Sequence, residues 1–127
     1  MNFQRTSPKW ITSLQPDEVF VFGSNLQGLH AGGAAKLAMQ WGAVWGKGVG
    51  LQGQTYAIPT MQGDVDTIRP HVDEFISFAK QHPNKRFLVT EIGCGIAGFS
   101  VGQIPLFKKA ITVDNIYLPE KFWNILG

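Results

Sequence analysis

The feature that most constrains the fold is a short apolar run that leads into a glycine-rich segment and then into a stretch of small residues. Residues 19–22 (VFVF) are β-branched or aromatic, which is typical of a strand buried on both faces. Gly23-Ser24-Asn25 follows at once, and an alanine-rich stretch begins after Gly32-Gly33. In a strand–loop–helix segment, backbone N–H groups at the start of the helix favour an anion. The segment therefore predicts an anion-binding loop at the end of a strand.

A second segment near the C-terminus repeats this order. The apolar stretch 87–92 (FLVTEI) leads into seven residues with three glycines, Gly93-Cys94-Gly95-Ile96-Ala97-Gly98-Phe99. Glycine carries a high entropic cost on folding, and a cluster of this kind commonly lets a ligand approach the backbone closely. Two strands that each end in such a loop predict one crevice with two walls.

The spacing of apolar residues predicts the fold class. The 127 residues are enough for one domain with a hydrophobic core, residues 1–127. Strands are expected at 18–23, 55–60, 86–92 and 115–118, and helices follow or separate them, the longest from residue 66 to about residue 81. Alternating strands and helices predict an α/β protein, a three-layer α/β/α sandwich with a mainly parallel (mixed) sheet.

Composition excludes several classes of function. The net charge of +2 is small and the basic residues form no block, so we expect no general nucleic-acid binding. One cysteine and three scattered histidines predict no disulfide, no metal site and no cofactor. No apolar run approaches the ~20 residues of a membrane-spanning helix. Because the N-terminal residues lack the apolar centre of a signal peptide, we expect a cytoplasmic protein, in a bacterium or a phage-infected cell.

One apparent motif does not fit its context. Residues 48–53 (GVGLQG) match the G-x-G-x-x-G pattern of dinucleotide-binding proteins. That pattern binds a pyrophosphate when it follows a strand and opens a helix. Here it precedes the expected strand at 55–60, and we therefore interpret it as an unrelated glycine loop.

Together, the two strand–loop segments resemble those of macro domains, the ADP-ribose-binding fold. In that family a strand leads to an asparagine, a glycine cluster and a helix of small residues, and a later strand enters a glycine loop that wraps the diphosphate. The sequences of the loops resemble those of small macro-like proteins of bacteria and their phages. Lys9-Trp10-Ile11-Thr12 stands where the family carries Gly-Asp-Ile-Thr, so Trp10 replaces the aspartate that recognises adenine.

The resemblance implies a function and a set of contact residues. It implies binding of ADP-ribose or a related nucleotide diphosphate, with contacts from Gly23, Ser24, Asn25, His30, Gly32, Gly33, Gly93, Cys94, Gly95, Ile96, Ala97, Gly98 and Phe99. An ADP-ribosylated macromolecule is a possible partner. Recognition of the adenine ring is left open by Trp10.

Two further functions stay open at this point. The chain could hydrolyse ADP-ribosyl bonds, with Asn25 fixing the distal ribose and Glu91 or a ligand phosphate as the base. It could instead be a phage accessory protein that acts through a host partner. Each residue also has a simpler interpretation: Asn25 as a turn residue, Glu91 as half of a salt bridge, and Cys94 as a small buried side chain.

Overall fold

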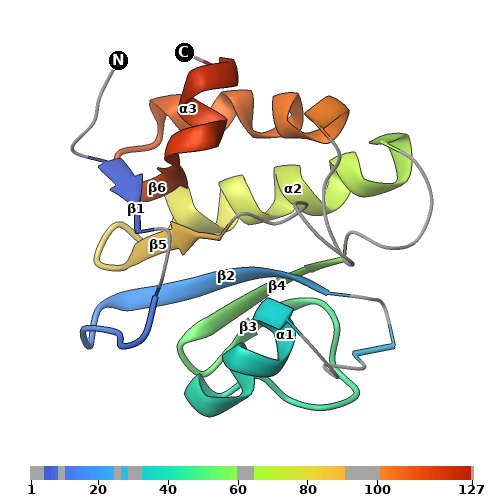
Figure 1. Ribbon diagram of the computed structural model, residues 1–127, viewed down its shortest axis with the longest axis vertical. Coiled ribbons are helices and arrows are strands. Elements are labelled where there is room, and N and C mark those ends of the chain that lie inside the picture. Colours follow the sequence, from blue (N-terminus) through green and yellow to red (C-terminus); the bar gives the residue numbers. More distant parts are fainter. Residues whose placement is uncertain are drawn as a thin grey trace.

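A six-stranded mixed sheet forms the centre of the protein (Figure 1). The computed structural model describes residues 5–8, 11–24, 27–28, 33–59, 65–90 and 101–126. The strands lie in the order β1 (Thr6–Ser7), β6 (Ile116–Pro119), β5 (Arg86–Val89), β2 (Glu18–Ser24), β4 (Thr55–Pro59) and β3 (Gly50–Gln52). Neighbouring strands are parallel except for β3, which is antiparallel to β4. The expected α/β class with a mainly parallel sheet is confirmed.

The apolar run of β2 lies at the centre of this sheet, between β5 and β4. Side chains alternate between the two faces of a strand, so Val19 and Val21 pack in one hydrophobic cluster and Phe20 and Phe22 in another. All four are 2% exposed or less. The prediction of a strand buried on both faces is confirmed.

Three helices lie against the face that carries Val19 and Val21: α2 (Val65–Lys80), the 3₁₀ helix η3 (Val101–Thr112) and α3 (Glu120–Leu126) (Figure 1). The helical spacing expected from residue 66 is confirmed in α2, which buries Ile68, Val72, Phe75, Ile76 and Ala79. The helix between β5 and β6, η3, has the tighter 3₁₀ geometry. Within η3, Phe107 and Ala110 lie three residues apart and are both buried, which matches the three-residue turn of a 3₁₀ helix.

The opposite face carries α1 (Gly33–Ala38), the short 3₁₀ turn η2 (Met39–Trp41) and the segment before β2 (Figure 1). Ile11, Ala38 and Ala43 are buried there, and Trp41 packs on Phe20 with ring centroids 5.0 Å apart. Ile11 is therefore a docked residue rather than part of a strand. Gly42, at φ +112°, ends the helical stretch in the left-handed conformation that glycine adopts without strain.

The connections follow a consistent rule. The connections from β1 to β2 and from β2 to β4 lead toward the β3 edge, and they pass over the face that carries α1 and Ile11. The connections from β4 to β5 and from β5 to β6 lead toward the β1 edge, and they pass through α2 and η3 over the other face. A single handedness of parallel crossovers requires this separation.

The strand boundaries differ from the expected ones at the edges. The four expected strands are present, although β5 ends at Val89 and β4 at Pro59. The two edge strands, β1 and β3, are additional, since two or three residues of strand leave no readable periodicity. Among the described residues, no helix has the length and apolar character needed to cross a membrane.

The side chains of Arg5 and Asn115 form hydrogen bonds between segments that are distant in sequence. The Arg5 guanidinium donates to the carbonyl oxygens of Val113 at 2.6 Å and Ile116 at 2.8 Å and also to that of Ile111, and it lies 5.3 Å from the Trp123 ring. The Asn115 amide donates to the carbonyl oxygens of Ala79, His82 and Lys85 at 2.9–3.0 Å. Asn115 thereby satisfies carbonyl groups at and beyond the end of α2.

Candidate functional site

The carboxyl ends of β2 and β5 lie side by side at one edge of the sheet. β2 pairs in parallel with β5, with Val21 in register with Val89. The Thr90 backbone N–H and hydroxyl both donate to the carbonyl oxygen of Val21, at 3.1 and 2.8 Å. The chain therefore leaves both strands at the same edge, which we call the rim.

The chain leaves these two strands in opposite directions. From β2 it runs through α1 toward β3 and β4, and from β5 it runs through η3 toward β6 (Figure 1). Adjacent parallel strands with diverging connections define a topological switch point. In open α/β sheets a crevice forms there, outside the carboxyl ends of the strands, and ligands bind in it.

The structure describes only part of the predicted contact set. Gly23 and Ser24 are the last residues of β2 and are buried, and Gly33 is the first residue of α1. The Ser24 hydroxyl donates to the carbonyl oxygen of Gly48. The remaining predicted residues lie outside the described ranges: Asn25, His30, Gly32, Glu91, Gly93, Cys94, Gly95, Ile96, Ala97, Gly98 and Phe99. Trp10 lies outside them as well.

The loop of residues 44–50 contacts the end of β2 at Ser24 and the backbone of Gly28. The Gly46 N–H donates to the carbonyl oxygen of Gly28 at 2.9 Å, and Gly28 has φ +71°. A Cβ atom on Gly28 would lie 2.1 Å from the nitrogen of Lys47. Glycine is thus required at position 28, because the two backbones touch.

The loop of residues 44–50 is itself fixed by a buried amide. Gln52 is 4% exposed. Its Oε1 accepts from the Val44 N–H at 2.7 Å, and its Nε2 donates to the Lys47 carbonyl oxygen at 3.0 Å. Gln52 lies in β3, inside the G-x-G-x-x-G match at 48–53. The match contains this edge strand and precedes β4, as expected, and it does not open a helix.

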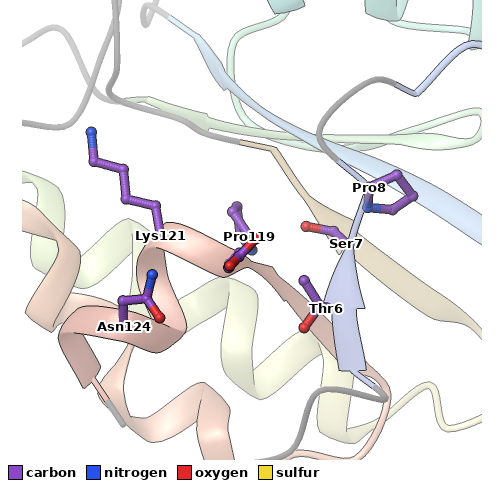
Figure 2. A pocket seen from close by; sticks show the side chains of 7 residues that line it. Thr6, Ser7, Pro8, Pro119, Lys121 and Asn124 are labelled. Atoms are coloured by element: carbon purple, nitrogen blue, oxygen red, sulfur yellow. The ribbon is translucent and has the colours of Figure 1, made fainter.

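A pocket of about 480 Å³ lies at the same rim, beyond β5. Figure 2 shows Thr6, Ser7 and Pro8 on one side, Lys121 and Asn124 of α3 on the other, and Pro119 between them. The Ser7 hydroxyl donates to the Val89 carbonyl oxygen at 2.6 Å, which joins the pocket to the end of β5.

The pocket residues were missed by sequence reasoning. Thr6 and Ser7 belong to a two-residue strand, and nothing in their sequence indicates which strand they pair with. The available signal was Pro119, which marks the junction of β6 and α3. Among the described residues, the buried Oγ1 of Thr6 has no hydrogen-bond partner.

The shifted pKa values of the described residues belong to groups away from the rim. A side-chain hydrogen bond from Arg86 lowers the pKa of Asp17, at the amino ends of β2 and β5, where Nε and Oδ2 are 2.7 Å apart. Burial, together with the charge of Glu74, raises the pKa of Tyr56 to about 12. Within the described ranges no group of three or more His, Cys, Asp or Glu residues could hold a metal ion.

Comparisons with known proteins identify no relative. A scan against protein-family models, a search of curated proteins and a search of solved structures each found no match.

Proposed function

We propose that the chain binds ADP-ribose or a related nucleotide diphosphate in a cleft at the rim, as a macro-like domain. The observation that carries the proposal is the switch point between β2 and β5. Both strands end at the rim, and in the sequence each is followed by one of the two glycine-rich segments.

The fold supplies further support. Helices on both sheet faces are compatible with the three-layer α/β/α arrangement that the proposal requires. The pocket between β1, β6 and α3 adjoins the end of β5. Its lining combines the Asn124 amide, the Lys121 ammonium and the Glu120 carboxylate with two prolines, groups that suit the hydroxyls and ring of a nucleoside better than its phosphates. In this proposal one end of a nucleotide diphosphate bound at the rim enters the pocket, because Ser7 joins the pocket to the end of β5.

Isothermal titration calorimetry with ADP-ribose, ADP, AMP and ribose 5-phosphate tests the proposal. We expect ADP-ribose and ADP to bind more tightly than AMP, because the glycine segments provide N–H groups for a diphosphate. Gly95→Val and Gly98→Val should abolish binding, since each places a side chain on the backbone that the phosphates approach. Lys80→Ala, at the exposed end of α2, is the matched control and should bind normally.

Two outcomes oppose the proposal in different ways. Undiminished affinity in both valine variants, with a normal thermal unfolding curve, removes residues 93–99 from the site. Absence of binding by every nucleotide tested, in a folded wild-type protein, refutes nucleotide binding altogether. Asn124→Ala examines the pocket separately: it should weaken ADP-ribose and leave inorganic pyrophosphate unaffected, because the pyrophosphate lacks the part that enters the pocket.

A further inference from the structure

One wall of the pocket at the rim is formed by β1, the shortest of the described strands. β1 has two residues and pairs with β6, with Thr6 in register with Leu118 and Ser7 with Pro119. Proline has no N–H group, so Pro119 donates no hydrogen bond to the ladder. Because so few residues take part in this parallel pairing, the backbone ladder alone holds β1 weakly.

Side chains add the contacts that the short ladder does not supply. Directly before β1, the Arg5 guanidinium donates to three carbonyl oxygens of residues 111–116 and lies 5.3 Å from the Trp123 ring. Trp123 Nε1 donates to the Arg5 carbonyl oxygen at 3.1 Å. Within β1, the Ser7 hydroxyl donates to the Val89 carbonyl oxygen. The docked position of β1 therefore depends on Arg5 and Ser7.

The contacts of Arg5 are the strongest of these attachments. A charged donor forms stronger hydrogen bonds than a neutral one, and carbonyl groups at the end of a helix carry the negative end of the helix dipole. Arg5 is not among the residues that line the pocket. It therefore acts on the pocket through β1.

The pocket is complete only while β1 is docked. Figure 2 shows β1 and Pro8 on one side of it and Lys121 and Asn124 of α3 on the other. If β1 leaves, the α3 side loses the wall that faces it, and the space opens to solvent. A ligand that contacts both walls therefore binds the docked form more tightly than the undocked form.

A short edge strand can leave the sheet while the core stays folded. Thr6 and Ser7 are polar, and neither belongs to the two hydrophobic clusters that flank the central strands. Local opening at an edge costs less free energy than global unfolding. Undocking of β1 is thus an equilibrium within the folded protein.

We infer that β1 gates the pocket at the rim and that Arg5 is the positioning residue that keeps β1 docked. By linkage, a ligand in the pocket favours docking by the same factor by which docking favours the ligand. The apparent dissociation constant equals the intrinsic one divided by the docked fraction of β1. The identity of the ligand rests on the proposed function, whereas the dependence of the pocket on β1 follows from the contacts.

Hydrogen–deuterium exchange of peptides that contain Thr6 and Ser7, read by mass spectrometry, measures the undocking of β1. ADP-ribose at about ten times its dissociation constant should slow this exchange about tenfold, because it binds only the docked form. Inorganic pyrophosphate should leave the exchange unchanged, since it is too short to enter the pocket from the glycine segments. Arg5→Ala should speed the exchange about tenfold or more, because the hydrogen bonds of a charged donor are lost.

The ratio of two affinities separates positioning from a general loss of stability. Arg5→Ala should weaken ADP-ribose and leave pyrophosphate unaffected, whereas a purely structural role would weaken both together. Arg5→Lys keeps the charge without the planar guanidinium, so it should fall between the wild type and Arg5→Ala, and it serves if the alanine variant does not fold.

Arg86→Ala is the matched control. The Arg86 guanidinium donates to the Asp17 carboxylate at 2.7 and 3.0 Å, at the amino ends of β2 and β5 and away from the pocket. Its removal also costs hydrogen bonds of a charged donor. The exchange of β1 and the ratio of the ADP-ribose and pyrophosphate affinities should both stay at their wild-type values.

Three results overturn the inference. If ADP-ribose binds in calorimetry but leaves the exchange of β1 unchanged, the gate is refuted and the proposed function stands. If Arg5→Ala weakens ADP-ribose and pyrophosphate by the same factor, Arg5 supports the fold alone. If no nucleotide binds the folded wild-type protein, the proposed function and the inference fall together.

Discussion

Replacement of Gly28 by alanine tests how the rim is built. Gly28 has φ +71°, and its carbonyl oxygen accepts from the Gly46 N–H at 2.9 Å. A Cβ at this position would lie 2.1 Å from the Lys47 nitrogen and 2.4 Å from the Gly46 carbonyl carbon, against 3.4–4 Å for ordinary contact. Both clashing atoms are backbone atoms. The two loops must therefore separate by about 1 Å, which breaks the hydrogen bond between them.

The expected cost has two parts. An L-residue at positive φ costs about 1 kcal/mol or slightly more. Loss of the Gly28–Gly46 hydrogen bond adds about 1 kcal/mol. Gly28→Ala should therefore lower the free energy of unfolding by about 2–3 kcal/mol. Gly46→Ala is the matched control, because Gly46 also has positive φ, +91°, but a Cβ there meets nothing within 4 Å. It should cost only about 1 kcal/mol.

Urea denaturation followed by circular dichroism measures both values. Under the proposed function, Gly28→Ala should also reduce ADP-ribose affinity more than Gly46→Ala, because it displaces the exit of β2. Equal losses of stability in the two variants would refute the argument, since the difference between them isolates the contact between the loops.

Three further predictions concern other parts of the chain. Asn115→Asp should lower the free energy of unfolding by about 3 kcal/mol or more, because a carboxylate would face three carbonyl oxygens without a donor, whereas Asp114→Asn, at an exposed neighbour, should be nearly neutral in the same urea titration. Because the pKa of Tyr56 is raised to about 12 in the folded state, its contribution to stability is complete below pH 10 and is lost as the pH rises from 10 to 12; Tyr56→Phe should lack this alkaline loss, of about 2–3 kcal/mol, in pH-dependent unfolding. If the chain is a hydrolase, release of ADP-ribose from a modified protein should stop in Asn25→Ala; loss in Glu91→Gln as well would identify a protein base, and retained turnover there would favour a ligand phosphate as the base.

The central strands could be predicted because their sequences carry strong patterns. A strand with four consecutive apolar residues, such as residues 19–22, is stable only when both of its faces are buried, and glycine marks its end. The helical spacing of Ile68, Val72 and Phe75 was equally clear, and α2 buries all three. Such elements can be predicted from the local sequence, without knowing which distant residues they contact.

The edges of the sheet and the pocket could not be predicted for the opposite reason. Thr6 and Ser7 form a strand only because β6 lies beside them, and Gln52 is buried because three groups of its loop converge on its amide. Such residues are polar and look like loop positions when they are read locally. The catalytic and ligand-contact assignments to Asn25, Glu91 and the Gly93–Phe99 segment stay predictions, because these residues lie outside the described ranges.

The attachment of β1 has a consequence for how the protein is made. Arg5 lies far in sequence from its partners: all three carbonyl groups that it binds belong to residues 111–116, and the contact with Ile116 spans 111 positions. β1 has β6 as its strand neighbour, so it cannot pair until Ile116–Pro119 has been synthesised. The β2–β4–β5 core can assemble earlier, since its strands are complete by Val89. During synthesis we therefore expect β1 to join the sheet only after the β2–β4–β5 core can form, because closing this edge depends on the segment that contains β6.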